Sequence, residues 1–157
     1  MINDKLLLES LHIFYRNVYN RDKLLSVITE EKNISLRSID WFITNYSKKE
    51  NTYYIIYENS DKNPTFEEKN KNYKKNMNVF HSYKSQLKSY HKSKFDPFCR
   101  NKRINFEYEN GSIETTVGQL NFFRWAIENN IIDYIINNID IIEKDMIDSL
   151  KDIYTKK

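Results

Sequence analysis

The sequence predicts an α+β fold that is mostly helical. Apolar residues recur at three- and four-residue spacing over much of the chain, and only two glycines and two prolines interrupt its 157 residues. The dipeptide Asn110-Gly111 also lies between two short β-type segments, which is typical of a hairpin. We therefore expect an N-terminal helical bundle, a small antiparallel sheet with an Asn-Gly hairpin, and C-terminal helices. The length suits a single domain, residues 1–157.

Three helical patterns predict the N-terminal bundle. Residues 4–19 carry apolar side chains on one stripe, and residues 22–31 repeat this pattern over a shorter length. Ser35 has the position of an N-cap for a third helix, whose inner face extends over residues 36–46. Each helix has a single apolar side, so we expect the three to pack together.

Strand and loop signals follow in the middle of the chain. Residues 52–58 are β-branched and aromatic, which predicts a strand. Residues 59–76 are polar and contain a proline, so we expect a mobile loop there. Helical spacing returns in residues 77–92, and residues 103–108 and 112–115 are the predicted arms of the hairpin.

The C-terminal part is predicted to be helical. Thr116 and Gln119 have the spacing of a capping box, and two further helices are expected at residues 131–137 and 141–154. The lone Cys99 excludes an internal disulfide and suits a reducing compartment. No run approaches the roughly 20 apolar residues of a membrane span. These features predict a soluble protein that is not secreted.

Charge is distributed very unevenly. Residues 69–103 hold eleven lysines and arginines against one acid, Asp96, whereas the segments before and after are net acidic. Aromatic residues are interleaved with these cations, and cations together with exposed rings suit phosphates and unstacked bases. We therefore expect a nucleic-acid interface. Its predicted phosphate contacts are Lys84, Lys88, Lys92, Lys94, Arg100, Lys102 and Arg103, with Tyr73 and Phe95 as candidates for stacking.

Other interpretations of the same residues remain open. A basic run is often only a solvated surface, and the acidic C-terminal helices could fold over it and neutralise it. The stripe formed by Phe80, Tyr83, Leu87 and Tyr90 has the spacing of a helix that packs on a core. The opposite charges of the middle and C-terminal parts also suit a protein-interaction or virion structural module, which would bind an acidic protein or a second copy.

No enzyme class is favoured. Asp96, Glu107 and Glu109 faintly resemble the carboxylates of a metal-dependent nuclease, but no lysine follows a strand carboxylate at the required spacing. Cys99 lies among cations, yet a lone cysteine is more often a packed residue. Three histidines and one cysteine lack zinc-site spacing, and Gly118 has no phosphate-loop pattern around it. We expect no catalytic residues, metal or cofactor.

Three blocks carry a family resemblance: LRSIDWFITNYSKK (36–49), FHSYKSQLKSYHKSKFDPFCRNKRINF (80–106) and TTVGQLNFFRWAIENNIIDYI (115–135). They resemble an uncharacterised family encoded by nucleocytoplasmic large DNA viruses, the giant viruses. The resemblance implies a viral protein of the host cytoplasm, in the viral factory, or of the virion, and it implies no catalytic residues. Combined with the charge pattern, it predicts a small viral protein that binds DNA or RNA with little sequence preference, in genome packaging, transcription or replication.

Overall fold

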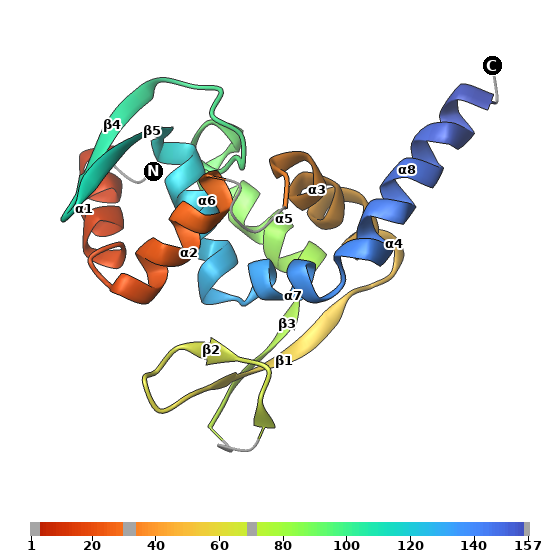
Figure 1. Ribbon diagram of the computed structural model, residues 1–157, viewed down its shortest axis with the longest axis horizontal. Coiled ribbons are helices and arrows are strands. Elements are labelled where there is room, and N and C mark those ends of the chain that lie inside the picture. Colours follow the sequence, from red (N-terminus) through yellow and green to blue (C-terminus); the bar gives the residue numbers. More distant parts are fainter. Residues whose placement is uncertain (1–3, 30–33, 69–71, 156–157) are drawn as a thin grey trace.

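Figure 1 shows a computed structural model of the chain, which describes residues 4–29, 34–68 and 72–155. The helical elements are α1 (Asp4–Phe14), α2 (Val18–Ile28), α3 (Leu36–Trp41), the π-helical turn η1 (Phe42–Tyr46), α4 (Ser47–Lys49), α5 (Val79–Tyr90), the 3₁₀ turn η3 (Lys92–Lys94), α6 (Val117–Glu128), α7 (Ile131–Asn137) and α8 (Ile139–Thr155). The strands are β1 (Tyr53–Glu58), β2 (Pro64–Thr65), β3 (Tyr73–Asn78), β4 (Arg103–Tyr108) and β5 (Gly111–Thr116). The predicted mostly helical α+β fold is confirmed.

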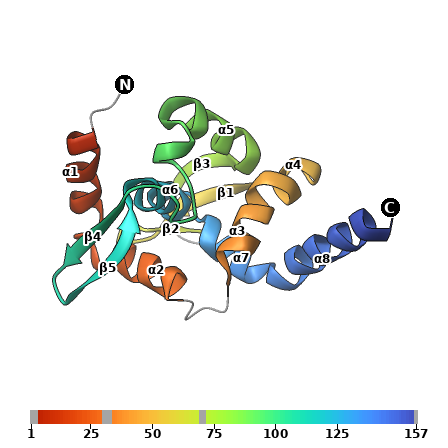
Figure 2. The same ribbon diagram turned by 90° about the horizontal axis from the view of Figure 1, so that it is seen from above.

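Helix α6 is the centre of the fold. Most of its residues are buried, and α1, α2, β5, η3 and α7 all contact it. In Figure 2, α1, α2 and the β4–β5 hairpin lie on one side of α6, whereas α3, α7 and α8 lie on the other. The segment between α5 and β4, residues 91–102, also crosses α6; we call it the connector. One apolar core therefore includes residues of the N-terminal and the C-terminal helices, from Leu7 to Ile142.

The N-terminal helices share this core. The predicted first helix ends at Phe14, and α2 begins at Val18. The Tyr15 hydroxyl, just after α1, donates a hydrogen bond of 2.7 Å to the carbonyl of Leu120 in α6. Helix α3 instead contacts α8, and the hydroxyl of Ser35 caps α3 as predicted, accepting from the Ser38 N–H at 3.0 Å. Helices α1 and α2 therefore pack on α6, α3 packs on α8, and the three do not form a separate core.

The first sheet contains strands that the sequence did not indicate. Strand β1 lies between β2 and β3, and both pairings are antiparallel. The predicted loop, residues 59–76, in fact contains β2 and the first four residues of β3. These polar residues are extended because the backbone of β1 supplies their hydrogen-bond partners. Residues 69–71 lie outside the described ranges, and the mobility of the segment stays a prediction.

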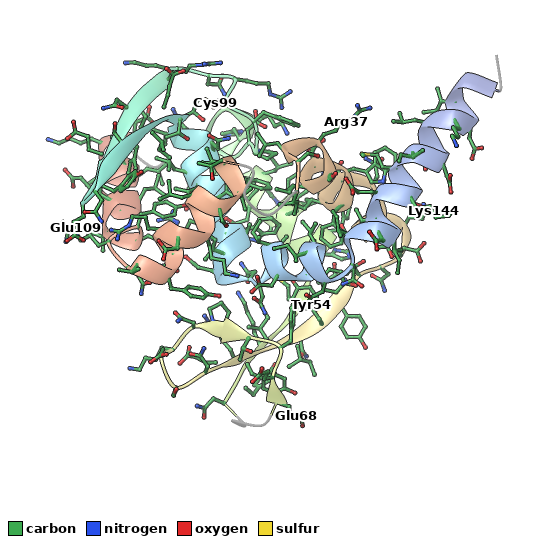
Figure 3. The ribbon with its side chains drawn as sticks, viewed as in Figure 1. Arg37, Tyr54, Glu68, Cys99, Glu109 and Lys144 are labelled. Carbon is green, nitrogen blue, oxygen red and sulfur yellow. The ribbon has the colours of Figure 1, made fainter. Side chains whose placement is uncertain are left out.

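Tyr54 connects this sheet to the helices. Its hydroxyl donates a 2.7 Å hydrogen bond to the carbonyl of Asn129, at the end of α6. Its ring stacks on Tyr134 of α7 with centroids 5.0 Å apart, and Phe66 meets it edge-on at 5.2 Å. In Figure 3, Tyr54 lies between the sheet and α7. The sheet is therefore held against the α6–α7 junction.

The predicted hairpin is confirmed as β4–β5. Tyr108 pairs with Gly111, so the turn residues are Glu109 and Asn110, and Gly111 is the first residue of β5. Thr116 then caps α6, its hydroxyl accepting from the Gln119 N–H at 3.0 Å. The Gln119 side chain does not close the capping box, because its oxygen accepts from the Thr115 hydroxyl at 2.7 Å. Its amide nitrogen donates to the Pro97 carbonyl at 2.9 Å. This bond fixes the connector against α6.

A polar cluster anchors the first half of α8. The Asp145 carboxylate accepts a hydrogen bond from Trp41 Nε1 at 2.9 Å and pairs with the ammonium group of Lys49. Glu143, half a turn away, accepts from the Ser38 hydroxyl at 3.1 Å. Burial raises the pKa of Asp145, but the hydrogen bonds from Lys49 and Trp41 outweigh burial and hold its pKa below the usual value.

This pKa predicts a loss of stability in acid. A carboxylate whose pKa is lower in the folded state stabilises the fold above its unfolded pKa, and that contribution disappears as the pH falls through the folded pKa. We expect Asp145→Asn to lower the free energy of unfolding by about 1 kcal/mol at pH 7, and we expect this difference to shrink as the pH falls below the ordinary carboxyl pKa of about 4. Urea unfolding of both proteins between pH 3 and 7 measures this. A deficit that stays constant down to pH 3 would contradict the assignment.

Candidate nucleic-acid interface

Helix α5 carries the predicted basic surface. Asn78 caps it, its side-chain oxygen accepting from the His81 N–H at 3.1 Å. Tyr83 is buried, and Leu87 and Tyr90 pack against the core. This stripe of α5 is therefore a core face, as its spacing indicated. Phe80, at the first turn, is half-buried. This packing fixes the orientation of α5 and leaves its other side in solvent.

Lys84 and Lys88 lie on that exposed side, one turn apart. Neither ammonium group has a carboxylate within 4.0 Å in the part of the chain that the structure describes. Like charges at this spacing repel and destabilise an isolated helix by a few tenths of a kcal/mol. The local repulsion is thus uncompensated within the described ranges, and a bound anion would relieve it.

Lys48 adds a third cation that the sequence did not assign to this surface. Helix α4 contacts α5, and Lys48 Nζ lies 5.6 Å from the centroid of the Phe80 ring. Lys48 is exposed and, like the two α5 lysines, has no described carboxylate within 4.0 Å. The sequence feature that could have indicated Lys48 is the Lys48-Lys49 doublet at the end of the predicted third helix. We call Lys48, His81, Lys84 and Lys88 the α4–α5 basic face.

Four other predicted phosphate contacts are partly neutralised. Lys94 pairs with Asp4 of α1 at 2.8 Å, and Arg103 pairs with Glu114 of β5 at 2.6 Å. Lys92 and Arg100 both approach Asp96, at 3.9 and 2.9 Å. The neutralising acids therefore come from α1, the connector and β5, and not from the C-terminal helices as one interpretation expected. Lys69 and Lys71, also part of the basic run, lie outside the described ranges.

The connector holds Asp96 as a structural residue. Asp96 is buried, accepts from the Phe98 N–H at 3.1 Å, and receives two hydrogen bonds from the Arg100 guanidinium. Nearby, burial raises the pKa of Asp40, the charge of Asp96 adds to this rise, and Lys92 and Arg100 oppose it. Asp96 and Asp40 thus offset the charges of Lys92 and Arg100.

The two candidates for base stacking differ. Tyr73 on β3 is 60% exposed, so its ring can meet a base. Phe95 is 0% exposed, and its ring packs between Phe122 and Trp125 with centroids 5.1 and 5.4 Å away. The prediction that Phe95 stacks on bases is therefore wrong, because the connector turns this ring into the core above α6.

Lys102 is exposed, has no carboxylate within 4.0 Å among the described residues, and lies apart from the α4–α5 basic face. It lines a cavity of about 520 Å³ bounded by α1, the connector, β4 and the start of α6. Lys94 and Asp4, which pair with each other, line the same cavity. Lys102 is thus a second, smaller point of positive charge on the connector side.

The residues considered for catalysis are not brought together. In Figure 3, Cys99 lies in the connector and Glu109 at the opposite end of the hairpin. Glu107 and Glu109 line a cavity of about 310 Å³ with Arg16 and Arg21, away from Asp96. Within the described ranges, no three His, Cys, Asp or Glu side chains are close enough to hold a metal ion. The nuclease interpretation gains no support from this geometry.

Comparison with known proteins identifies the family. Residues 2–157 match a family of unknown function, DUF7197. The chain belongs to this family. It is also similar to uncharacterized protein L507 of Acanthamoeba polyphaga mimivirus, with 41% identity over 140 residues, which cover 85% of the chain and 49% of L507. The chain thus spans about half the length of this relative. No solved structure matches it.

The predicted membership of an uncharacterised giant-virus family is confirmed by these two matches. They support the description of the chain as a viral protein. No helix in the described ranges is both long and apolar enough to cross a membrane.

Proposed function

We propose that this viral protein binds nucleic acid through the α4–α5 basic face. One observation carries the proposal: Lys84 and Lys88 lie one turn apart on the exposed side of α5, Lys48 lies over Phe80 at the first turn of the same helix, and no described carboxylate lies within 4.0 Å of any of them. A polyanion placed on this face would relieve the repulsion and release its own condensed counterions. Tyr73, exposed on β3, offers a ring for an unstacked base.

The lysines of the α4–α5 basic face favour contacts with the sugar-phosphate backbone of the nucleic acid. A lysine ammonium is a point charge on a flexible stem, so it binds phosphates without reading bases, and arginine would be expected for bidentate contacts to guanine. Successive lysines on α5 are about 6 Å apart along the helix axis. The proposed binding is therefore largely independent of sequence and applies to DNA or RNA. A role in packaging, transcription or replication, in the viral factory or the virion, fits this mode.

The decisive experiment is a binding titration of the double variant Lys84→Glu/Lys88→Glu. Fluorescence anisotropy with labelled single- and double-stranded DNA and RNA, between 50 and 200 mM salt, gives the affinity and its salt dependence. We expect the variant to bind at least about tenfold more weakly. Its slope of log affinity against log salt should be shallower by about 1.8 for duplex DNA, because two phosphate contacts are lost.

The matched control is Lys62→Glu/Lys151→Glu, which changes the net charge equally. Lys62 lies in the β1–β2 turn and Lys151 on α8, both exposed and both outside the α4–α5 basic face. Circular dichroism shows whether each variant is folded. An equal loss of binding in both double variants would show that the loss comes from the change in net charge and not from the α4–α5 basic face. Undetectable binding by the wild type at low salt would end the proposal.

A protein-interaction or virion structural module is the second candidate, and α8 favours it. The outer part of α8 projects from the rest of the molecule (Figure 1). It carries Ile147 and Ile153, which are 49% and 57% exposed. Burial of such side chains in a partner is favourable. Light scattering across a concentration series tests self-association: a mass that rises with concentration, without binding to nucleic acid, favours this candidate.

A further inference from the structure

A polar pocket of about 300 Å³ lies between β3, α5 and α6. Most of the side chains that line it can donate or accept hydrogen bonds. They include Lys75, Ser82, Gln86, Tyr90, Arg124 and Asn129. The cavity beneath the hairpin offers a contrast: its two arginines face two glutamates, so its charges cancel.

Two cations of this pocket lack a close carboxylate. Lys75 is half-buried; burial lowers its pKa, and the charge of Lys74 lowers it further, opposed only by Glu128. Arg124 donates to the Ser10 hydroxyl at 3.0 Å and to the Asn121 side-chain oxygen at 2.8 Å, and both acceptors are neutral. In the described ranges, no carboxylate lies within 4.0 Å of either cation. Glu128 lines the pocket but is exposed.

Several neutral groups in the same pocket are also unpaired. Asn129 is 3% exposed; its amide nitrogen donates to the Trp125 carbonyl at 2.8 Å, but its oxygen has no hydrogen-bond partner. A buried polar atom of this kind destabilises the fold if it stays unpaired. The side chains of Gln86 and Tyr90 likewise form no hydrogen bond within the described part of the chain. The pocket thus combines excess positive charge with free donors and acceptors.

We infer that this pocket binds a nucleotide, with its phosphate between Lys75 and Arg124 and its base against Gln86 and Tyr90. A phosphate monoester carries close to two negative charges, and an ammonium and a guanidinium group bind it through charge-assisted hydrogen bonds. Amide and hydroxyl groups read the edge of a base, and the rings of Tyr90 and Trp125 offer apolar contact. The volume lies at the lower end of the range for small-molecule sites. The nucleotide is either free or an unstacked residue of a strand.

This site does not rest on the proposed function, because it uses the opposite side of α5. Ser82, Gln86 and Tyr90 recur every fourth residue and form one stripe of the helix. Lys84 and Lys88 are each two residues from this stripe, about 200° around the axis at 100° per residue. Substitutions on the α4–α5 basic face should therefore leave the pocket unchanged.

The test is a titration of the full chain with each of the four ribonucleoside monophosphates. Calorimetry measures the affinity, and the fluorescence of Trp125, which lines the pocket, reports its occupancy. Inorganic phosphate and the matching nucleosides are titrated in parallel, and we expect at least one mononucleotide to bind at least about tenfold more tightly than either part alone. A short oligonucleotide distinguishes the two sources when it is titrated into the Lys84→Glu/Lys88→Glu variant, in which the α4–α5 basic face no longer contributes. In that variant it binds more tightly than the mononucleotide if the pocket takes a nucleotide of a strand.

Lys75→Gln and Lys74→Gln form a matched pair, because the two residues are neighbours on β3 and only Lys75 lines the pocket. We expect Lys75→Gln to weaken mononucleotide binding about tenfold or more and Lys74→Gln to leave it within about twofold of the wild type. Lys84→Glu/Lys88→Glu should also retain the wild-type affinity for the mononucleotide. Equal losses in the two glutamine variants, equal affinity for phosphate and nucleotide, or no nucleotide binding at millimolar concentration would each overturn the inference.

Discussion

Replacing Phe95 with alanine is expected to lower the free energy of unfolding by about 3–5 kcal/mol, measured by urea denaturation followed by circular dichroism. The Phe95 ring is fully buried and lies 5.1 Å from the Phe122 ring and 5.4 Å from that of Trp125. Tyr90 stacks nearly parallel to it at 6.4 Å. Alanine would remove the apolar surface that these rings cover and leave a cavity, and both effects destabilise the folded state.

Tyr73→Ala is the control, because Tyr73 is an aromatic residue of the same basic region but is 60% exposed. Its loss should change stability by no more than about 0.5 kcal/mol. If Phe95→Ala does not fold, Phe95→Leu retains much of the volume and should cost about 1–2 kcal/mol. Similar stabilities for Phe95→Ala and Tyr73→Ala would contradict the burial of the Phe95 ring in the core.

Phe95 shows where sequence patterns stop being informative. It lies in the connector, next to Asp96-Pro97, where no helical or strand period indicates which side of the chain is buried. Its burial depends on α6, more than twenty residues further along. The residues of α5 were predictable, since a helical stripe assigns Tyr83 to the core and Lys84 to solvent from local spacing alone.

Local signals predicted most of the fold. Ser35 and Thr116 cap helices as their positions indicated, and the hairpin around Asn110 follows from the turn composition. Strand β3 was missed because its residues, Tyr73 to Asn78, are mostly polar and have low strand propensity. They are extended because β1 lies beside them, and strand pairing is a property of the tertiary structure.

The candidate interface was predictable as a set of cations but not as a distribution of charge. The pairing of Lys94 with Asp4 joins residues 90 positions apart, which no local pattern reveals. The approach of Lys48 to α5 likewise needs the packing of α4. Lys75 and Arg124, 49 positions apart, line the same polar pocket. Sequence composition thus indicated a class of partner, whereas the surfaces that would bind it depend on the fold.

Gly118→Val is the second substitution with a large expected effect, a loss of about 2–3 kcal/mol in the free energy of unfolding. A Cβ atom at Gly118 would lie 3.0 Å from the Ser93 carbonyl oxygen and 3.4 Å from the Lys94 carbonyl carbon and the Phe95 nitrogen. All three are backbone atoms of the connector, so relief requires the connector to move away from α6. Chemical or thermal denaturation measures the loss.

Gly111→Val is the matched control. A Cβ atom there would also meet an atom at 3.0 Å, but that atom is the hydroxyl oxygen at the end of the Tyr108 side chain, which can rotate away. Valine also suits the strand that Gly111 opens. We expect Gly111→Val to change stability by less than about 1 kcal/mol. Equal losses at the two glycines would show that the close approach of the connector to α6 does not limit the size of residue 118. A loss confined to Gly118 would show that the connector packs closely on α6 because residue 118 has no side chain.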